Sequence, residues 1–306
     1  MSDVHAFNEY GRLTRVVVKH VRDAFGGQPQ IDAQWRDLHF TAAPDFERAS
    51  AQYDRFIQIV GSRGAEVLTL PPRAGVGLDS IYARDASMVT PGGIVLCGMS
   101  KKQREREPAA QGAALTAWGV EVVGAIRPPG RLEGGDVVWL DRRTVVVGRG
   151  YRTNDDGIAQ LRTLLGDTVE VMVVPLPHWR GPADVFHLMS VISPVDEHLA
   201  VVYSPLMPVP FREHLQRKDI ALVEVPDDEF ERMGANVLAI APRTCVMVAG
   251  CPETRRRLEA AGAEVLVYEG DEISLKGGGG PTCLTRPIVR RQDSQTAGGS
   301  AAECVE

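Results

Sequence analysis

A pattern of residues that recurs about every 50 positions constrains the fold of this 306-residue chain more than any other feature. Each copy begins with a polar or reactive residue, followed by an apolar run, a short turn and a second apolar run. The spacings are 51, 51, 49 and 47 positions, and the leading residues are Asp85, Asp136, His187, Asn236 and Cys283. A period in this range is typical of an array of similar supersecondary units. Residues at equivalent positions converge where such units face a common axis, so the pattern predicts a shared site.

The segments between the paired runs predict the rest of each unit. Apolar residues have helical spacing or helix boundary signals over residues 43–64, 103–119, 154–166, 211–217 and 253–262. A short strand pattern follows at 65–70, 120–126, 169–176, 221–226 and 263–269. Each unit is therefore expected to be ββαβ, and the strand at 14–20 is available to complete the fifth unit. Pairing the two ends of a chain is a common way to close a propeller. The sequence thus predicts an α/β fold, a five-bladed α/β propeller around a central pore.

We expect a single propeller domain over residues 1–291 and a disordered tail over residues 292–306, because the tail is rich in Ser, Ala and Gly and contains only a peripheral Cys304. Residues 20–40 match neither a helix nor a strand. A surface loop is the favoured interpretation there, and a mobile lid over a site is the alternative. The basic runs 104–106 and 255–257 are expected on solvated helix faces.

Composition excludes several classes of function. An apolar content of 44% and a charged content of 24% are those of a soluble globular protein. The net charge of −6 disfavours nucleic acid and anionic membranes as partners. No apolar run is long enough to span a membrane, and the N-terminus lacks the apolar core of a signal peptide. The five cysteines are odd in number and form no CxxC pair, which favours a reducing cytoplasm over disulfides or a zinc site. No metal is expected, and a homodimer is compatible with the sequence.

Four of the candidate residues also have ordinary structural interpretations. Cys283 follows four glycines that allow close backbone approach to a ligand, but a free cysteine is often a small buried apolar residue. His187 lies in an apolar stretch and could be a core histidine, or it could be the proton-transfer partner of a nucleophilic thiol. Glu133 and Asp136 flank Gly-Gly, where they could cap a turn or orient His187. Asp85 could bind a planar cation through two parallel hydrogen bonds. A thiol, an imidazole and several carboxylates together suit attack on the carbon of a guanidinium group.

Six motifs, spread over nearly the whole chain, resemble those of the guanidine-modifying enzymes of the pentein superfamily and occur in the same order. They are RDA (84–86), LEGGD (132–136), YRTN (151–154), FHL (186–188), AN (235–236) and GGGGPTC (277–283). The resemblance implies that Cys283 is the nucleophile, that His187 protonates the leaving amine and then activates water, and that Glu133 holds His187. It also implies that Asp85 binds the guanidinium and Arg152 the substrate carboxylate, with Arg149 a second candidate. Asp136 and Asn236 complete the predicted substrate-binding set. Members of the superfamily need no cofactor.

The residue two positions after His187 distinguishes branches of the superfamily. Arginine deiminases and amidinotransferases carry His-x-Asp, whereas this chain has Met189, as the dimethylarginine hydrolases have a non-acidic residue there. The resemblance therefore implies a hydrolase of a small-molecule guanidino compound, an N-substituted arginine, although Arg84 beside Asp85 is a deiminase-like feature. An amidinotransferase and a catalytically inactive binding propeller are the alternatives. Trp179 could border the pocket, but a packing role is the favoured interpretation.

Overall fold

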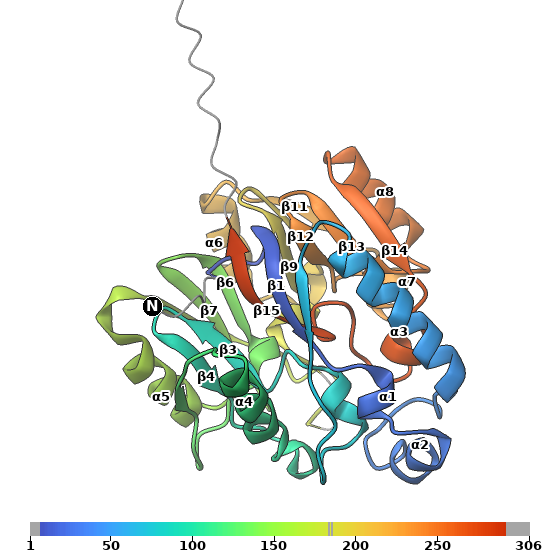
Figure 1. The fold of residues 1–306 in the computed structure, drawn as a ribbon. Helices are drawn as coiled ribbons and strands as arrows, with labels where there is room; N and C mark the ends of the chain where they lie inside the picture. The colour runs from blue at the N-terminus through green and yellow to red at the C-terminus, as the bar shows by residue number, and fades with distance from the viewer. Residues whose placement is uncertain (1–6, 183, 185, 292–306) are drawn as a thin grey trace, which may run out of the picture.

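A computed structural model describes residues 7–182, 184 and 186–291, and contains five sheets of three strands each (Figure 1). In every sheet the first two strands pair antiparallel and the second and third pair parallel. The sheets are β3 (Ser87–Thr90), β4 (Gly93–Leu96) and β5 (Val122–Ala125); β6 (Val137–Asp141), β7 (Thr144–Arg149) and β8 (Glu170–Pro175); β9 (Ile192–Asp196), β10 (Leu199–Val202) and β11 (Ala221–Glu224); β12 (Leu238–Ala241), β13 (Thr244–Val248) and β14 (Glu264–Tyr268); and β15 (Thr285–Arg291), β1 (Arg12–Val18) and β2 (Glu66–Thr69).

One long helix precedes the third strand of each sheet, as the ββαβ prediction requires. These helices are α4 (Glu107–Ala117), α5 (Asp155–Leu165), α6 (Val209–Arg217), α8 (Pro252–Ala260) and α3 (Phe46–Gly61). Local signals set their ends: the Asn154 side chain accepts a hydrogen bond from Gly157 N at the start of α5, and Asp45 does the same from Arg48 N at the start of α3. The predicted α/β repeat is confirmed.

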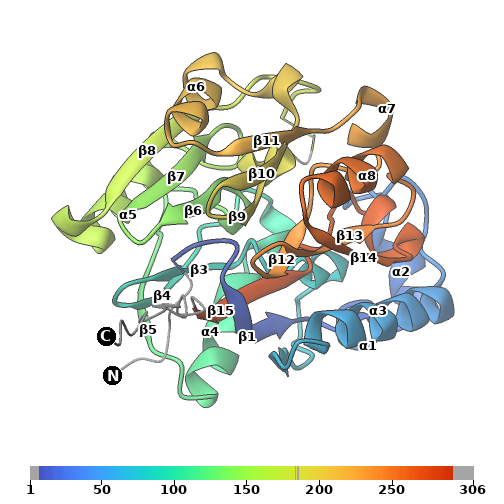
Figure 2. The same cartoon turned by 90° about the horizontal axis from the view of Figure 1, so that it is seen from above.

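The two ends of the described chain meet in one sheet. β1 pairs antiparallel with β15, with Val16 opposite Pro287 and Val18 opposite Thr285, and it pairs parallel with β2. The prediction that the N-terminal strand completes the fifth unit is therefore confirmed. Seen from above, the five sheets lie around a common centre with the long helices outside (Figure 2). β12 packs against both β1 and β9, and β15 packs against β3, so the first strands of the units lie innermost.

Residues 20–40 differ from the expected irregular loop. They contain the short helices α1 (Val21–Ala24) and α2 (Gln28–Gln34). His20 caps α1 by accepting from Arg22 N, and Pro29 lies in the first turn of α2. These helices are too short for a helical period to be recognised in sequence, but Val21, Phe25 and Ile31 of this segment are fully buried in the core beside α3.

The other expectations on the fold have mixed outcomes. A further short helix, α7 (Asp227–Phe230), was not predicted. The predicted disordered tail 292–306 lies outside the described residues, so the domain boundary at 291 stays a prediction. Among the described helices, none combines the length and the apolar character that crossing a membrane requires.

Candidate active site

The structure places the five repeat residues equivalently and brings several of them together. Asp85, Asp136, His187, Asn236 and Cys283 each lie shortly before the first strand of a sheet. A carboxylate oxygen of Asp85, a carboxylate oxygen of Glu133 and a ring nitrogen of His187 all lie within 4.8 Å of one another. His187 and Cys283 both line two cavities: an outer cavity of about 200 Å³ and an inner cavity of about 10 Å³. The thiol and the imidazole, 96 positions apart, thus face the same space.

Glu133 holds the His187 ring. Glu133 Oε2 lies 2.8 Å from His187 Nε2, and Glu133 Oε1 accepts hydrogen bonds from Ser100 N at 2.8 Å and from Ser100 Oγ at 2.6 Å. The carboxylate is completely buried. Burial opposes the charged form, but His187 and the nearby Arg152 outweigh it and lower the pKa of Glu133 below its usual value. The predicted pairing of this acid with His187 is present in the structure.

The same electrostatics favour a protonated imidazole. Burial lowers the pKa of His187, but the negative charges of Asp85, Asp136 and Glu133 outweigh burial and raise that pKa above its ordinary value. Gly135 allows this close approach, because a Cβ there would lie 2.8 Å from the His187 ring and 2.9 Å from Asp85 Oδ1. His187 is therefore suited to give a proton to a departing group.

Cys283 is held at the end of the glycine-rich loop. The Asn236 side chain donates from Nδ2 to Cys283 Sγ at 3.3 Å, and its Oδ1 accepts from Thr282 N at 3.0 Å. Gly280 permits this contact, since a Cβ there would lie 2.6 Å from Asn236 Cγ. Burial and the charge of Asp85 raise the pKa of the Cys283 thiol, while the Asn236 and Thr282 hydrogen bonds and Arg84 oppose them. Without a bound ligand, the site therefore favours the neutral thiol.

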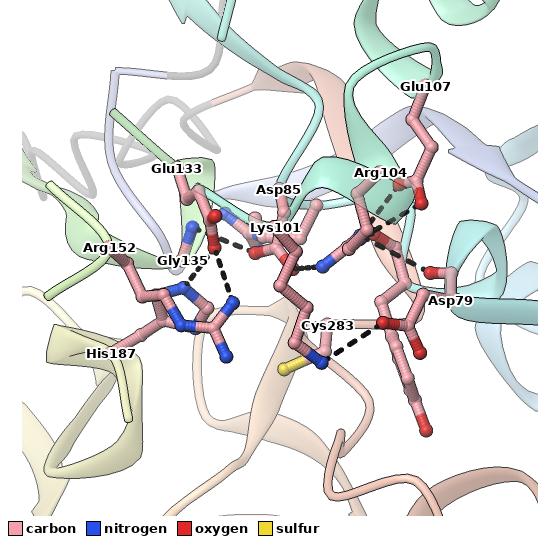
Figure 3. Close-up of polar contacts among 12 residues, drawn as sticks. Asp79, Asp85, Lys101, Arg104, Glu107, Glu133, Gly135, Arg152, His187 and Cys283 are labelled. Carbon is pink, nitrogen blue, oxygen red and sulfur yellow. Dashed lines mark hydrogen bonds and ion pairs between the residues drawn. The ribbon is translucent and has the colours of Figure 1, made fainter. Parts of the chain in front are cut away.

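Asp85 is already paired with a buried arginine. Asp85 Oδ2 lies 2.7 Å from Arg104 Nη1, and Asp85 Oδ1 accepts from Gly135 N at 3.2 Å (Figure 3). Arg104 also forms a two-pronged ion pair with Glu107, at 2.9 and 2.8 Å. Burial raises the pKa of Glu107 to about 7, against the opposing effect of Arg104. Any cation that binds Asp85 must therefore share this carboxylate with Arg104.

Arg104 is the main residue of the candidate site that sequence analysis missed. It was expected on a solvated face, but only 3% of it is exposed and it lines the inner cavity. The one available signal was Glu107, three positions later, with which a helical arginine can pair. The expectation was correct for residues 255–257, whose side chains are 38–67% exposed.

The structure places the two arginines predicted to bind substrate in different environments, one buried and one exposed. Arg152 is buried, lines the inner cavity and lies 3.5 Å from Glu133 Oε2. Arg149 is exposed and pairs with the exposed Asp155 at 3.1 Å, away from both cavities. Its place at the exposed end of β7 is at odds with the predicted contact with substrate.

Asp136 and Trp179 also differ from expectation. Asp136 lines neither cavity, because its oxygens accept from Thr153 Oγ1 at 2.7 Å and Leu188 N at 2.9 Å. It therefore fixes the backbone next to His187, and burial raises its pKa to about 6. Trp179 is 39% exposed and lines the outer cavity, so it borders the pocket in addition to its favoured packing role. Its ring contacts Phe230 edge-on, and Met189 lies in the same wall.

A metal ion is poorly matched to the carboxylates at the centre of the site. Asp85, Glu133 and His187 have ligand types that metals accept. However, Arg104 and Arg152 already place positive charge against Asp85 and Glu133. The arrangement suits a planar cation that donates hydrogen bonds better than a compact metal ion. The absence of a metal requirement stays a prediction.

Comparison with known proteins places this site in a family. The family described as "N,N dimethylarginine dimethylhydrolase, eukaryotic" matches residues 28–290. The protein YkgA of Bacillus subtilis is 28% identical over 92% of this chain and 94% of its own length. The N(G),N(G)-dimethylarginine dimethylaminohydrolase of Streptomyces coelicolor is 30% identical over 81% of this chain and 88% of its length. The arginine deiminase of Rhodococcus jostii is 31% identical over only 52% of this chain and 46% of its own length.

Solved structures share the fold at lower identity. The N-terminal domain of the cyanobacterial arginine dihydrolase ArgZ has a TM-score of 0.76 at 20% identity, covering 90% of this chain and 97% of that domain. The amidinotransferase SxtG of Microseira wollei has a TM-score of 0.76 at 17% identity, covering 96% and 99%. The fold and the position of the site define a pentein, which confirms the resemblance found in the sequence. Within that superfamily the chain belongs to the N,N-dimethylarginine dimethylhydrolase family, and it is a hydrolase acting on the C–N bonds of amidines.

Proposed function

We propose that this protein is a cysteine-dependent hydrolase of a guanidino compound that works through a covalent intermediate on Cys283. The observation that carries the proposal is the convergence of Cys283, His187 and Asp85 on adjoining cavities, with Glu133 bonded to the imidazole. Thiol, proton donor and cation-binding carboxylate are the three groups that attack on a guanidinium carbon requires.

The chemistry begins with the thiol losing its proton to solvent as the substrate docks. A guanidinium beside Sγ favours the thiolate, offsetting the burial and the Asp85 charge that raise the thiol pKa. Sγ then attacks the guanidinium carbon, the C–N bond to the leaving amine breaks, and protonated His187 supplies the proton. The neutral imidazole next takes a proton from water, whose oxygen attacks the carbon and expels the thiolate. The products are a ureido compound and an amine.

The substrate class is an N-substituted ω-guanidino acid. One relative is a dimethylarginine dimethylaminohydrolase, and hydrolysis of dimethylarginine would give citrulline and dimethylamine. The apolar side chain of Met189 in the wall of the outer cavity suits an N-alkyl group on the substrate. The test is a panel of arginine, monomethyl- and dimethylarginine, agmatine and simple guanidino acids, scored for ureido product and released amine. The proposal predicts a mass increase on Cys283 during turnover, and a panel negative at several pH values would overturn it.

The alternative is amidino transfer, in which an amine instead of water resolves the same intermediate. The size of the outer cavity, about 200 Å³ beside Cys283, leaves room for such an acceptor. Adding ornithine, glycine or lysine and searching for a new guanidine by mass spectrometry distinguishes the two reactions. The four described cysteines are all free, which agrees with the cytoplasmic location that we propose.

Replacing Arg152 with alanine is expected to raise KM by roughly 10- to 100-fold, the usual value of a charge-assisted hydrogen bond to a substrate carboxylate. Because Arg152 also lies 3.5 Å from Glu133, kcat should fall as well. Arg149→Ala is the matched control, since Arg149 is exposed and forms an ion pair with the exposed Asp155. Steady-state kinetics of both variants check this, and an unchanged KM for Arg152→Ala would remove that residue from the substrate site.

Replacing Glu133 with glutamine is expected to lower kcat by about 100-fold or more, the range for a weakened proton donor. Glu133 raises the pKa of His187, so its neutralisation lowers that pKa and the donor loses its proton at lower pH. The alkaline limb of the profile of kcat/KM against pH should therefore move to lower pH. Glu231→Gln, an exposed residue of the outer cavity, is the control and should leave the limb in place.

A further inference from the structure

Asn236 contacts the sulfur of the proposed nucleophile but has no part in the reaction described above. It occupies the same position in its unit as His187 and Cys283, and it lines the outer cavity with both of them. The residue is 5% exposed, and its Nδ2 lies 3.3 Å from Cys283 Sγ. An amide N–H thus points at the atom that would attack the substrate.

The hydrogen bonds of Thr282 fix the direction in which this amide points. Asn236 Oδ1 accepts from Thr282 N at 3.0 Å and from Thr282 Oγ1 at 2.9 Å. A backbone N–H can only donate, so the amide atom that faces it must be the carbonyl oxygen. The other amide atom, which faces Cys283 Sγ, must therefore be the nitrogen.

The backbone on both sides of Asn236 is held by Ser193 of β9. The buried Ser193 Oγ donates to Ala235 O at 2.7 Å and accepts from Val237 N at 3.0 Å. Asn236 N itself donates to Met233 O at 2.9 Å. The amide is therefore fixed both by the neighbouring unit and by the glycine-rich loop, as a preorganised donor requires.

The bond between Asn236 and Cys283 becomes stronger when the sulfur is charged. A thiol sulfur is a weak acceptor, whereas a thiolate makes a charge-assisted hydrogen bond. Burial and the charge of Asp85 raise the pKa of the Cys283 thiol, and a donor held against Sγ opposes both effects. Thr282 Oγ1 lies farther from the sulfur, at 3.9 Å. Asn236 is thus the closer of these two donors to Sγ.

We propose that Asn236 is a catalytic residue, whose Nδ2–H stabilises the Cys283 thiolate when the sulfur attacks the guanidinium carbon and again when water expels it from the adduct. This inference rests on the proposed function and adds a residue to its machinery. The amide keeps both of its protons and forms no covalent bond. The bonds made and broken in the reaction are therefore those given above.

Charges from several segments also act on the sulfur. Asp85 disfavours the thiolate and Arg84 favours it. Other charged and titratable groups act on the sulfur or line its cavities, among them the ion pairs of the inner cavity and the side chains of Tyr82, His187, Tyr268 and Lys276. A substitution of Asn236 leaves all of these groups in the chain, so a change in the ionisation of Cys283 reports on the amide.

The test measures the thiolate without a substrate. Iodoacetamide reacts with the thiolate, so its rate of reaction with Cys283, followed by peptide mass spectrometry, reports the ionised fraction at each pH. In Asn236→Ala this rate at neutral pH should fall roughly 10- to 100-fold, the usual value of a hydrogen bond to a charged group. The rise of the rate with pH should move to higher pH, and kcat/KM should fall in parallel.

Asn236→Asp separates the donor from a merely structural role. The carboxylate keeps an oxygen for Thr282 N and the size of the side chain, but it presents an oxygen to Cys283 Sγ in place of the N–H. Alkylation should therefore be no faster than in Asn236→Ala, whereas a residue that only holds the loop would recover the wild-type rate. Asn154→Asp is the matched control, because this side chain caps α5 and lines neither cavity. It should react at the wild-type rate.

The outcomes separate this inference from the proposed function. A wild-type alkylation profile in Asn236→Ala, or recovery of the rate in Asn236→Asp, would overturn the role of Asn236 and leave the hydrolase intact. Absence of ureido product and of any Cys283 adduct with the whole substrate panel would instead overturn the proposed function. The two results are independent, because alkylation needs no substrate.

Discussion

Cys283→Ser is expected to reduce kcat on the order of 10⁴-fold or more while leaving the fold unchanged, because no other described thiol lines either cavity. A serine hydroxyl is far harder to ionise than a thiol, and the burial and Asp85 charge that already raise the Cys283 pKa would oppose an alkoxide more strongly. The measurement is amine release, together with intact mass after incubation with substrate.

Cys251→Ser is the matched control. Cys251 is buried at the start of α8, where its Sγ lies near the carbonyl oxygens of Glu229 and Arg232, and it lines neither cavity. Both variants should have wild-type circular dichroism, and only Cys283→Ser should lose turnover and the mass increase. Substantial activity in Cys283→Ser would exclude the covalent route and leave water attacking the guanidinium directly.

The repeat predicted the parts of the site that depend on position along a unit. A residue placed just before the first, innermost strand lies at the same level in every unit, so spacing alone brought His187, Asn236 and Cys283 to one region. The same reasoning failed for Asp136, because spacing fixes where a residue lies but not where its side chain points. The Asp136 carboxylate turns toward Thr153 and Leu188 instead of the cavity.

The ion pairs around the site could not be predicted, because they join residues about 20 positions apart whose contact depends on how the segments pack. Arg104 and Lys101 come from the segment between β4 and α4, where the recurring pattern specifies no particular residue. Their partners Asp85 and Asp79 lie about 20 positions earlier, across a sheet. In sequence a short basic segment next to a helix is most simply a solvated face. Only the packing of residues 78–85 against this segment makes it part of the cavity.

Arg149 and Arg152 are only three positions apart, yet the sequence could not predict which of them is buried in the site. Arg152 belongs to the YRTN motif and Arg149 precedes it, so the resemblance favoured Arg152 but gave no physical reason for the choice. Arg149 is at the last position of β7 and is exposed, whereas Arg152 lies in the following turn and is buried against Glu133. The alternation of side chains along β7 and the turn that follows it determine which arginine is buried. Both depend on the exact residue at which β7 ends, which sequence patterns do not fix.

His187→Ala is expected to lower kcat by roughly 10²- to 10⁴-fold, the usual cost of losing a proton-transfer group. The variant has no group to protonate the leaving amine and none to take a proton from the water that resolves the adduct. Substrate binding should change much less, because Asp85, Arg104 and Arg152 remain. His178→Ala is the matched control, since His178 is exposed and bonds to Tyr151.

The two roles of His187 can be separated by the choice of leaving group. An isothiourea analogue releases a thiolate, which departs without a proton, so the first step no longer needs the imidazole. Its second role remains, because water must still lose a proton to attack the adduct. With this analogue His187→Ala should form the Cys283 adduct at a rate near that of the wild-type enzyme and then retain it, as a stable mass increase. Rapid loss of the adduct in the variant would show that another group activates water, and failure to form it would show that His187 is needed to generate the thiolate.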